Sequence, residues 1–152
     1  MSAGLIVIAA VMGLLIGSFL TVVTERVPDG ESIVAPGSRC GACGLRLGPL
    51  DLVPVFSWLF LRGKCRRCRT NIGIEPLVLE LGTASLFVAM TLKFEDSLET
   101  IAFRVLAARL LALSWIDLRI KRLPREISYT TLAIGAPLLI VAALIRDEPR
   151  RI

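Results

Sequence analysis

Four cysteines in the sequence form two pairs with the same internal spacing. Cys40-Gly-Ala-Cys43 is followed, after 21 residues, by Cys65-Arg-Arg-Cys68. Two residues between cysteines let both thiolates bind one cation, and two such pairs complete a tetrahedral zinc site; the separation is close to the ~15–20 residues usual for such sites. The pattern therefore predicts one structural Zn²⁺ held by Cys40, Cys43, Cys65 and Cys68. Two alternatives stay open: disulfides in an oxidising compartment, and the reactive thiols of a membrane oxidoreductase.

A second candidate for chemistry is Asp117, in the stretch "SWIDLRIKRLP" from Ser114 to Pro124. This acid stands where an apolar run meets a basic segment. By position alone, Asp117 is better explained as a helix-end residue that pairs with Arg119 or Arg122. The chain contains no histidine, which excludes Ser-His-Asp triads, Cys-His dyads and H-E-x-x-H zinc peptidases.

The elements that position these residues are expected to be membrane helices. The mean hydropathy of +0.72 and the hydrophobic content of 55% are too high for an ordinary soluble domain. Residues 1–24 carry no charge and are long enough to span ~30 Å of hydrocarbon. Within them Gly13 and Gly17 form a small-xxx-small pair that favours close approach of a second helix. Three further apolar runs cover 77–92, 101–116 and 129–145.

We therefore predict an all-α polytopic membrane protein with about four transmembrane helices and a small zinc-binding insert between the first two. Its parts are a first helix at 1–24, the double-C-x-x-C insert at 25–71, and three further helices with the Asp117 loop at 72–152. Glu80 and Arg109, both inside apolar runs, are expected to approach each other or to line a polar cavity.

Charge predicts the orientation. The insert holds eight Lys or Arg residues and the segment 117–128 holds four, whereas the turn at 93–100 holds one. The positive-inside rule then puts the insert and Asp117 on the cytoplasmic side. The cations of the insert lack an accompanying aromatic ladder, so we expect them to balance charge and contact anionic lipid rather than bind nucleic acid.

Several stretches together resemble one known family. They are "GSFLTVVTERVP" at 17–28, the double-C-x-x-C insert with its Ser57-Trp58 and Arg62-Gly63 signatures, "EPLVLELGT" at 75–83, and "SWIDLRIKRLP". In this order they are similar to the N-terminal part of the type IV prepilin leader peptidases, which are membrane aspartic peptidases of bacterial pilus and type II secretion systems.

The resemblance implies a function and partners. It implies cleavage of the basic leader of prepilins or pseudopilins at the cytoplasmic face of the bacterial inner membrane, with Asp117 as the first catalytic aspartate. Many family members also methylate the new N-terminus with S-adenosylmethionine, and that cofactor is expected here only through the resemblance. The lipid bilayer is the other expected partner.

One departure from the family is serious. The family's second catalytic aspartate lies in a G-x-G-D motif, and these 152 residues contain none. We therefore expect the isolated chain to be inactive unless a second chain or further sequence supplies that aspartate. The alternatives are a fragment that binds zinc or prepilin without catalysis, and a C-x-x-C thiol oxidoreductase.

Overall fold

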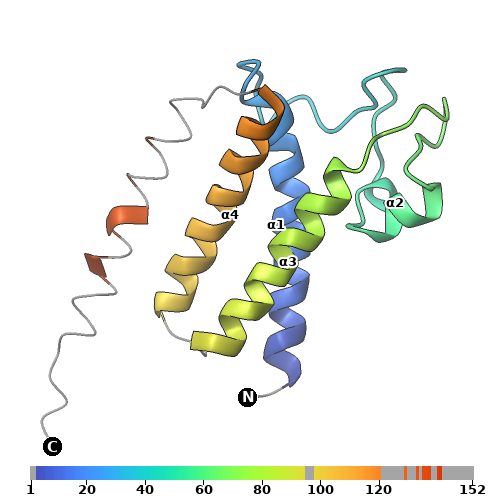
Figure 1. Ribbon diagram of the computed structural model, residues 1–152. Coiled ribbons are helices and arrows are strands. Elements are labelled where there is room, and N and C mark those ends of the chain that lie inside the picture. The colour runs from blue at the N-terminus through green and yellow to red at the C-terminus, as the bar shows by residue number, and fades with distance from the viewer. Residues whose placement is uncertain are drawn as a thin grey trace, which may run out of the picture.

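The computed structural model describes residues 3–94 and 98–120, together with the isolated positions 129, 133, 135–137 and 140–141. Its elements are the helices α1 (Ala3–Arg26), α2 (Phe56–Leu61), α3 (Glu75–Phe94) and α4 (Leu98–Ile120), with a 3₁₀ turn, η1 (Pro49–Asp51). In Figure 1 the three long helices lie side by side, and the insert that carries η1 and α2 lies at the end where α1 finishes and α3 begins. The structure assigns no strand to the described residues, which agrees with the all-α prediction.

The closest contact in the bundle joins the backbones of α1 and α3. A Cβ atom added to Gly17 would lie 2.5 Å from the Cα of Glu80, and one added to Gly13 would lie 2.5 Å from the Cα of Ala84. Real side chains cannot approach that closely, so both positions require glycine. The small-xxx-small pair predicted from the sequence is therefore the seam between α1 and α3, which run antiparallel.

α4 packs against both α3 and α1, and two of its arginines bind side chains of α3. Arg104 donates a hydrogen bond of 2.7 Å from Nη2 to Thr91 Oγ1, and its guanidinium lies 5.9 Å from the centre of the Phe87 ring. At the other end of α4, Arg119 pairs with Glu75, the first residue of α3, at 3.3 Å. This ion pair places the last turn of α4 beside the start of α3, at the end of the bundle that carries the insert.

Three of the four predicted helices are present in the described residues, and their bounds differ by only a few residues from the apolar runs. Two of them, α1 and α3, are long and apolar enough to cross a membrane. α4 is a helix of 23 residues, but it contains Arg104 and Arg109. The fourth run, 129–145, falls mostly outside the described residues.

The expectations for Asp117 and Glu80 are each met in part. Asp117 lies in the last turn of α4, in agreement with its interpretation as a helix-end residue, and not in a loop, because the helix continues to Ile120. Glu80 does not pair with Arg109 anywhere in the part of the chain that the structure describes; its carboxylate instead accepts a hydrogen bond of 2.6 Å from the backbone N–H of Val55. Glu80 does line a cavity, as the alternative expectation had it, whereas Arg109 is not among the residues that line this cavity.

The α1–α3 seam gives a first prediction. Gly17→Ala should destabilise the bundle by about 1–3 kcal/mol because the new methyl group overlaps the α3 backbone. Gly4→Ala is the matched control, since a Cβ at Gly4 meets nothing within 4 Å. Thermal unfolding in detergent, followed by circular dichroism, measures both. Equal midpoints for the two variants would contradict this packing.

Candidate metal centre and catalytic carboxylate

The insert is built from two loops that repeat each other at an offset of 25 residues. In the first, Cys40 N–H donates to Leu45 O at 2.8 Å and Gly44 N–H to Cys40 O at 2.8 Å. In the second, the equivalent bonds run from Cys65 N–H to Thr70 O at 2.9 Å and from Arg69 N–H to Cys65 O at 3.0 Å. Each loop is therefore the same knuckle, closed by its own backbone, with two cysteines on the turn.

The residue after each second cysteine has a positive φ angle. Gly44 has a φ of 67° and Arg69 a φ of 59°. This left-handed conformation turns the chain back after the C-x-x-C pair and suits glycine, whereas it is strained for arginine. The same turn therefore occurs in both knuckles, although one of the two positions holds an arginine.

The four cysteine sulfur atoms form one cluster. Each lies within 4.8 Å of the others, and the shortest distances are 3.8 Å between Cys40 and Cys68 and 3.9 Å between Cys43 and Cys65. A tetrahedron with zinc–sulfur bonds of ~2.3 Å has sulfur–sulfur edges of about 3.8 Å. The donor set and its spacing therefore fit one Zn²⁺ bound by four thiolates, with no position left open for a substrate.

Electrostatics also favours a cation at this point. The hydroxyl and the backbone N–H of Thr70 lower the pKa of Cys68 to about 6, and the N–H groups of Cys43 and Ala42 lower the pKa of Cys40. The N–H of Leu45 lowers the pKa of Cys43, but desolvation and the three neighbouring thiols together raise it to about 11. Four such close thiols cannot all ionise by themselves, and a bound divalent cation removes that conflict.

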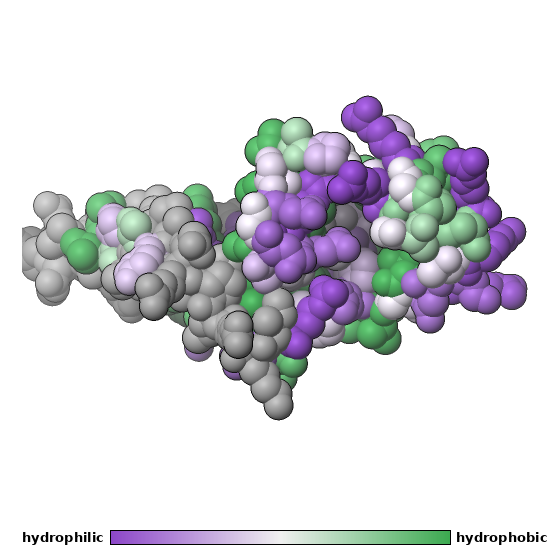
Figure 2. Space-filling model, turned by 90° about the horizontal axis from the view of Figure 1, so that it is seen from above, coloured by the Kyte–Doolittle hydropathy of each residue, from purple (hydrophilic) through white to green (hydrophobic). Residues whose placement is uncertain are grey.

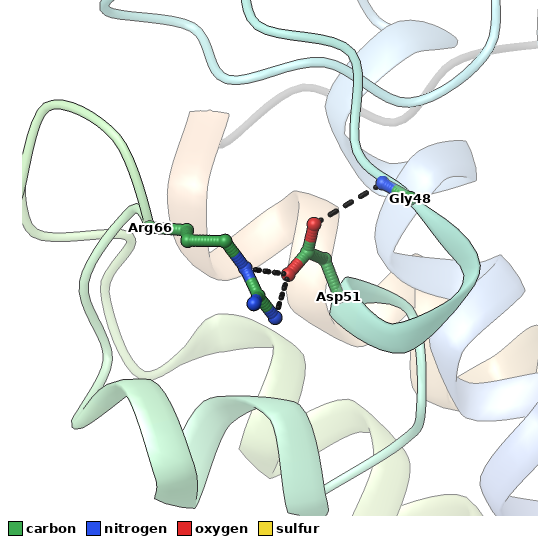
Figure 3. Close-up of polar contacts among 3 residues, drawn as sticks. All are labelled: Gly48, Asp51 and Arg66. Atoms are coloured by element: carbon green, nitrogen blue, oxygen red, sulfur yellow. Dashed lines mark hydrogen bonds and ion pairs between the residues drawn. The ribbon is translucent and has the colours of Figure 1, made fainter.

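An ion pair joins the second knuckle to the segment between the knuckles (Figure 3). Arg66 Nη2 lies 2.7 Å from Asp51 Oδ1, and Asp51 Oδ2 accepts a hydrogen bond of 3.2 Å from the N–H of Gly48. Arg66 is 56% exposed and Asp51 12% exposed. Asp51 therefore links the second knuckle to the segment between the knuckles.

A further contact ties the insert to α1. Arg26, at the end of α1, is buried and donates from Nη1 to the carbonyl oxygens of Ser32 at 2.9 Å and Pro36 at 2.8 Å. The hydrogen bond from Val55 N–H to Glu80 ties it to α3 in the same way. The sequence did not single out Arg26, because a cation at the end of an apolar run is also the ordinary signal of a membrane boundary.

A cavity of about 340 Å³, with both apolar and polar lining residues, lies between the insert and the ends of α1 and α3. The knuckle residues Cys40 and Cys65 form part of one wall. Four acidic residues line the cavity: Glu25 of α1, Glu75 and Glu80 of α3, and Asp51 of the insert. Such a volume is within the range of small-molecule sites.

Asp117 lies outside this cavity but at the same end of the bundle. It is exposed, two residues before Arg119, which pairs with Glu75 at the start of α3. Within the described residues Asp117 makes no hydrogen bond or ion pair, so the expected pairing with Arg119 is not formed. Arg122, Glu126, Asp147 and Glu148 fall outside those residues.

Comparison with known proteins identifies the family. Residues 11–94 match the model described as the Bacterial Peptidase A24 N-terminal domain, which is more than half of the chain. The chain belongs to the prepilin leader peptidase family. Two apolar helices and this family membership support a membrane protein.

Curated relatives of the chain are named as prepilin leader peptidases or leader peptide-processing enzymes. The chain is 40% identical over 128 residues, 84% of its own length and 38% of the relative's, to a prepilin leader peptidase/N-methyltransferase of Myxococcus xanthus. It is 36% identical over 135 residues to the Bacillus subtilis protein of that name, covering 89% of this chain and 53% of the relative. The Escherichia coli type 4 prepilin-like proteins leader peptide-processing enzyme is 34% identical over 97% of this chain and 60% of the relative. The chain thus spans about half the length of these relatives, and no solved structure matches it.

The metal centre gives a second prediction. The purified chain should contain one zinc per molecule, and Cys65→Ser should reduce this to well below one, because Cys65 is the buried member of the four. Arg67→Gln is the matched control, since Arg67 lies between the two cysteines of the same knuckle and is exposed. Elemental analysis after gel filtration measures the stoichiometry. Full zinc in Cys65→Ser would show that the four thiols are not the ligands.

Proposed function

We propose that this chain is the N-terminal part of an aspartic-type prepilin leader peptidase, which cleaves the basic leader of type IV prepilins or pseudopilins at the cytoplasmic membrane face. The observation that carries the proposal is the exposed Asp117 in the last turn of α4. This end of α4 lies at the end of the bundle that carries the insert with the four-thiol centre (Figure 1). Family membership and the printed names of the relatives support the substrate class.

In the proposed chemistry Asp117 is one of two carboxylates that share a proton. The ionised member takes a proton from water as the water oxygen attacks the scissile carbonyl, and the protonated member polarises that carbonyl. Asp117 suits either role because its carboxylate has no competing partner among the described residues. Glu75 is occupied by Arg119, and Asp51 by Arg66.

The second carboxylate is proposed to come from sequence beyond these 152 residues or from another chain. Two other functions were considered, a thiol oxidoreductase and a fragment that binds zinc or prepilin without cutting. The short sulfur distances join cysteines of different knuckles, Cys40 with Cys68 and Cys43 with Cys65, which favours a shared metal over two redox pairs. A binding fragment remains the alternative to the peptidase.

A second activity, methyl transfer from S-adenosylmethionine, is proposed on the names of the relatives and on the cavity beside the insert. That cofactor would supply a methyl group to the new N-terminal amine. Glu25 and Glu80 on the cavity wall are carboxylates that would attract its sulfonium cation. Labelled methyl incorporation in the cleavage assay below reports on this activity.

The proposed orientation gives a third prediction. Because the insert is rich in cations, it should lie in the cytoplasm with the start of α1 outside. A thiol reagent that cannot cross the membrane should label a cysteine at Gly4 or Asp96 in whole cells and should miss one at Ser38 or Arg125. Permeabilised cells, in which every position is accessible, are the control. Labelling at Ser38 and Arg125 alone would reverse the orientation.

The fourth prediction concerns catalysis. The isolated 152-residue chain should not cleave a prepilin, and joining it to the C-terminal helices of a relative, with their G-x-G-D aspartate, should produce cleavage. In that joined protein Asp117→Asn should reduce the rate by at least ~10³-fold, as loss of a catalytic carboxylate does in other peptidases.

Asp29→Asn is the matched control for that experiment, because it removes a carboxylate from the turn after α1 and should leave the rate unchanged. Zinc content should be the same in both variants, which separates catalysis from folding. Cleavage of prepilin by the isolated chain that depends on Asp117 would contradict the proposed need for an outside carboxylate.

A further inference from the structure

The short helix α2 has two faces of different character. Ser57, Trp58 and Leu61 line the cavity. On the other face, Phe56 is 58% exposed, Leu59 54% and Phe60 85%. Three large apolar side chains at i, i+3 and i+4 therefore form one exposed stripe, here called the outer face of α2.

The rotation of α2 about its own axis is set by contacts on the inner face. The indole N–H of Trp58 donates a hydrogen bond of 2.6 Å to the carbonyl oxygen of Gly73. Gly63 packs so closely on this ring that an added Cβ would lie 2.9 Å from it. Trp58 thus lies against the insert, and the outer face of α2 has no contact that would bury it among the described residues.

The depth of α2 follows from its contact with α3. Val55, the residue before α2, donates its N–H to Glu80, which lies five residues inside α3. At ~1.5 Å per residue this is about 7 Å from the start of that helix. Figure 1 accordingly has α2 beside the first turns of α3 rather than beyond the end of the bundle.

The length of α3 relates the depth of α2 to the thickness of a bilayer. α3 has 20 residues and is about 30 Å long, which equals the thickness of the hydrocarbon layer. If α3 crosses the membrane with its first residue at the boundary between headgroups and acyl chains, the start of α2 lies about 7 Å inside that boundary. Amphipathic helices that lie in the membrane surface bury their apolar faces about 5–10 Å into this boundary.

The charges next to α2 suit the same location. Arg62 directly follows the helix, and Lys64, Arg67 and Arg69 follow in the second knuckle, all of them exposed. Seen from above in Figure 2, hydrophilic side chains lie along the outer edge of the insert. This combination matches an anionic leaflet. The apolar side chains enter the acyl region, and the cations meet the lipid phosphates.

We propose that α2 is an interfacial helix whose outer face, Phe56, Leu59 and Phe60, is inserted into the anionic leaflet of the membrane that α1 and α3 cross. Through Glu80 on α3 and Trp58 on α2, the bilayer then helps to hold the insert against the end of the bundle. The proposal rests on the membrane-spanning role of α3 and not on peptidase activity.

Photo-crosslinking of the full 152-residue chain tests this directly. p-Benzoylphenylalanine is introduced at Phe60 or, as the matched control, at Val34, which is 84% exposed against 85% for Phe60 but lies in the loop after α1. Both proteins are reconstituted in nanodiscs of phosphatidylethanolamine and phosphatidylglycerol and irradiated, and intact-mass spectrometry measures lipid adducts. Zinc content verifies that the insert is folded in each.

The expected result is a lipid adduct at position 60 at least fivefold more abundant than at position 34. Equal yields at the two positions would overturn the proposal, and so would crosslinks from position 60 to a second protein chain in place of lipid. Asp117→Asn should leave the yield at position 60 unchanged. Failure of leader cleavage and failure of lipid insertion are therefore distinguishable.

Discussion

The insert between α1 and α3 has almost no hydrophobic core of its own. Its fold therefore depends on the centre formed by its four cysteine thiols. From residue 27 to residue 74, only Gly63 and Cys65 are buried. A segment of this size cannot be stable from apolar burial alone and needs a cross-link such as a metal ion. The two equivalent knuckles, each closed by its own backbone hydrogen bonds, supply that cross-link with the spacing of a zinc tetrahedron.

A second constraint connects the metal centre to the membrane helices. Gly13 and Gly17 let α1 and α3 touch along their backbones, and this contact positions Glu80 at the edge of the insert, where it binds the N–H of Val55. Arg26 binds carbonyl oxygens of the same insert from the end of α1. The metal centre, the cavity and the end of α4 that carries Asp117 are thereby gathered at one end of the bundle.

The sequence predicted the features that depend on local patterns. Paired cysteine spacing gave the four-thiol centre, and the apolar run 77–92 gave α3 to within two residues at each end. The partner of Glu80, the backbone N–H of Val55, could not be predicted, because every residue except proline has such a group. Sequence reasoning favours an oppositely charged side chain as the partner of a buried carboxylate, and Arg109 was therefore chosen. Asp117 was correctly expected near a helix end, but the boundary lies beyond it, because Arg and Lys are good helix formers and α4 continues to Ile120.

The central claim is that one zinc ion, bound by four thiolates, organises the insert of this prepilin peptidase family member. X-ray absorption spectroscopy at the zinc edge measures the ligands of the ion directly in the purified chain. The structure predicts four sulfur neighbours at ~2.3 Å and no nitrogen or oxygen neighbour in the same shell. A shell with two sulfurs and two lighter atoms would contradict it, because the two knuckles would then not share one metal.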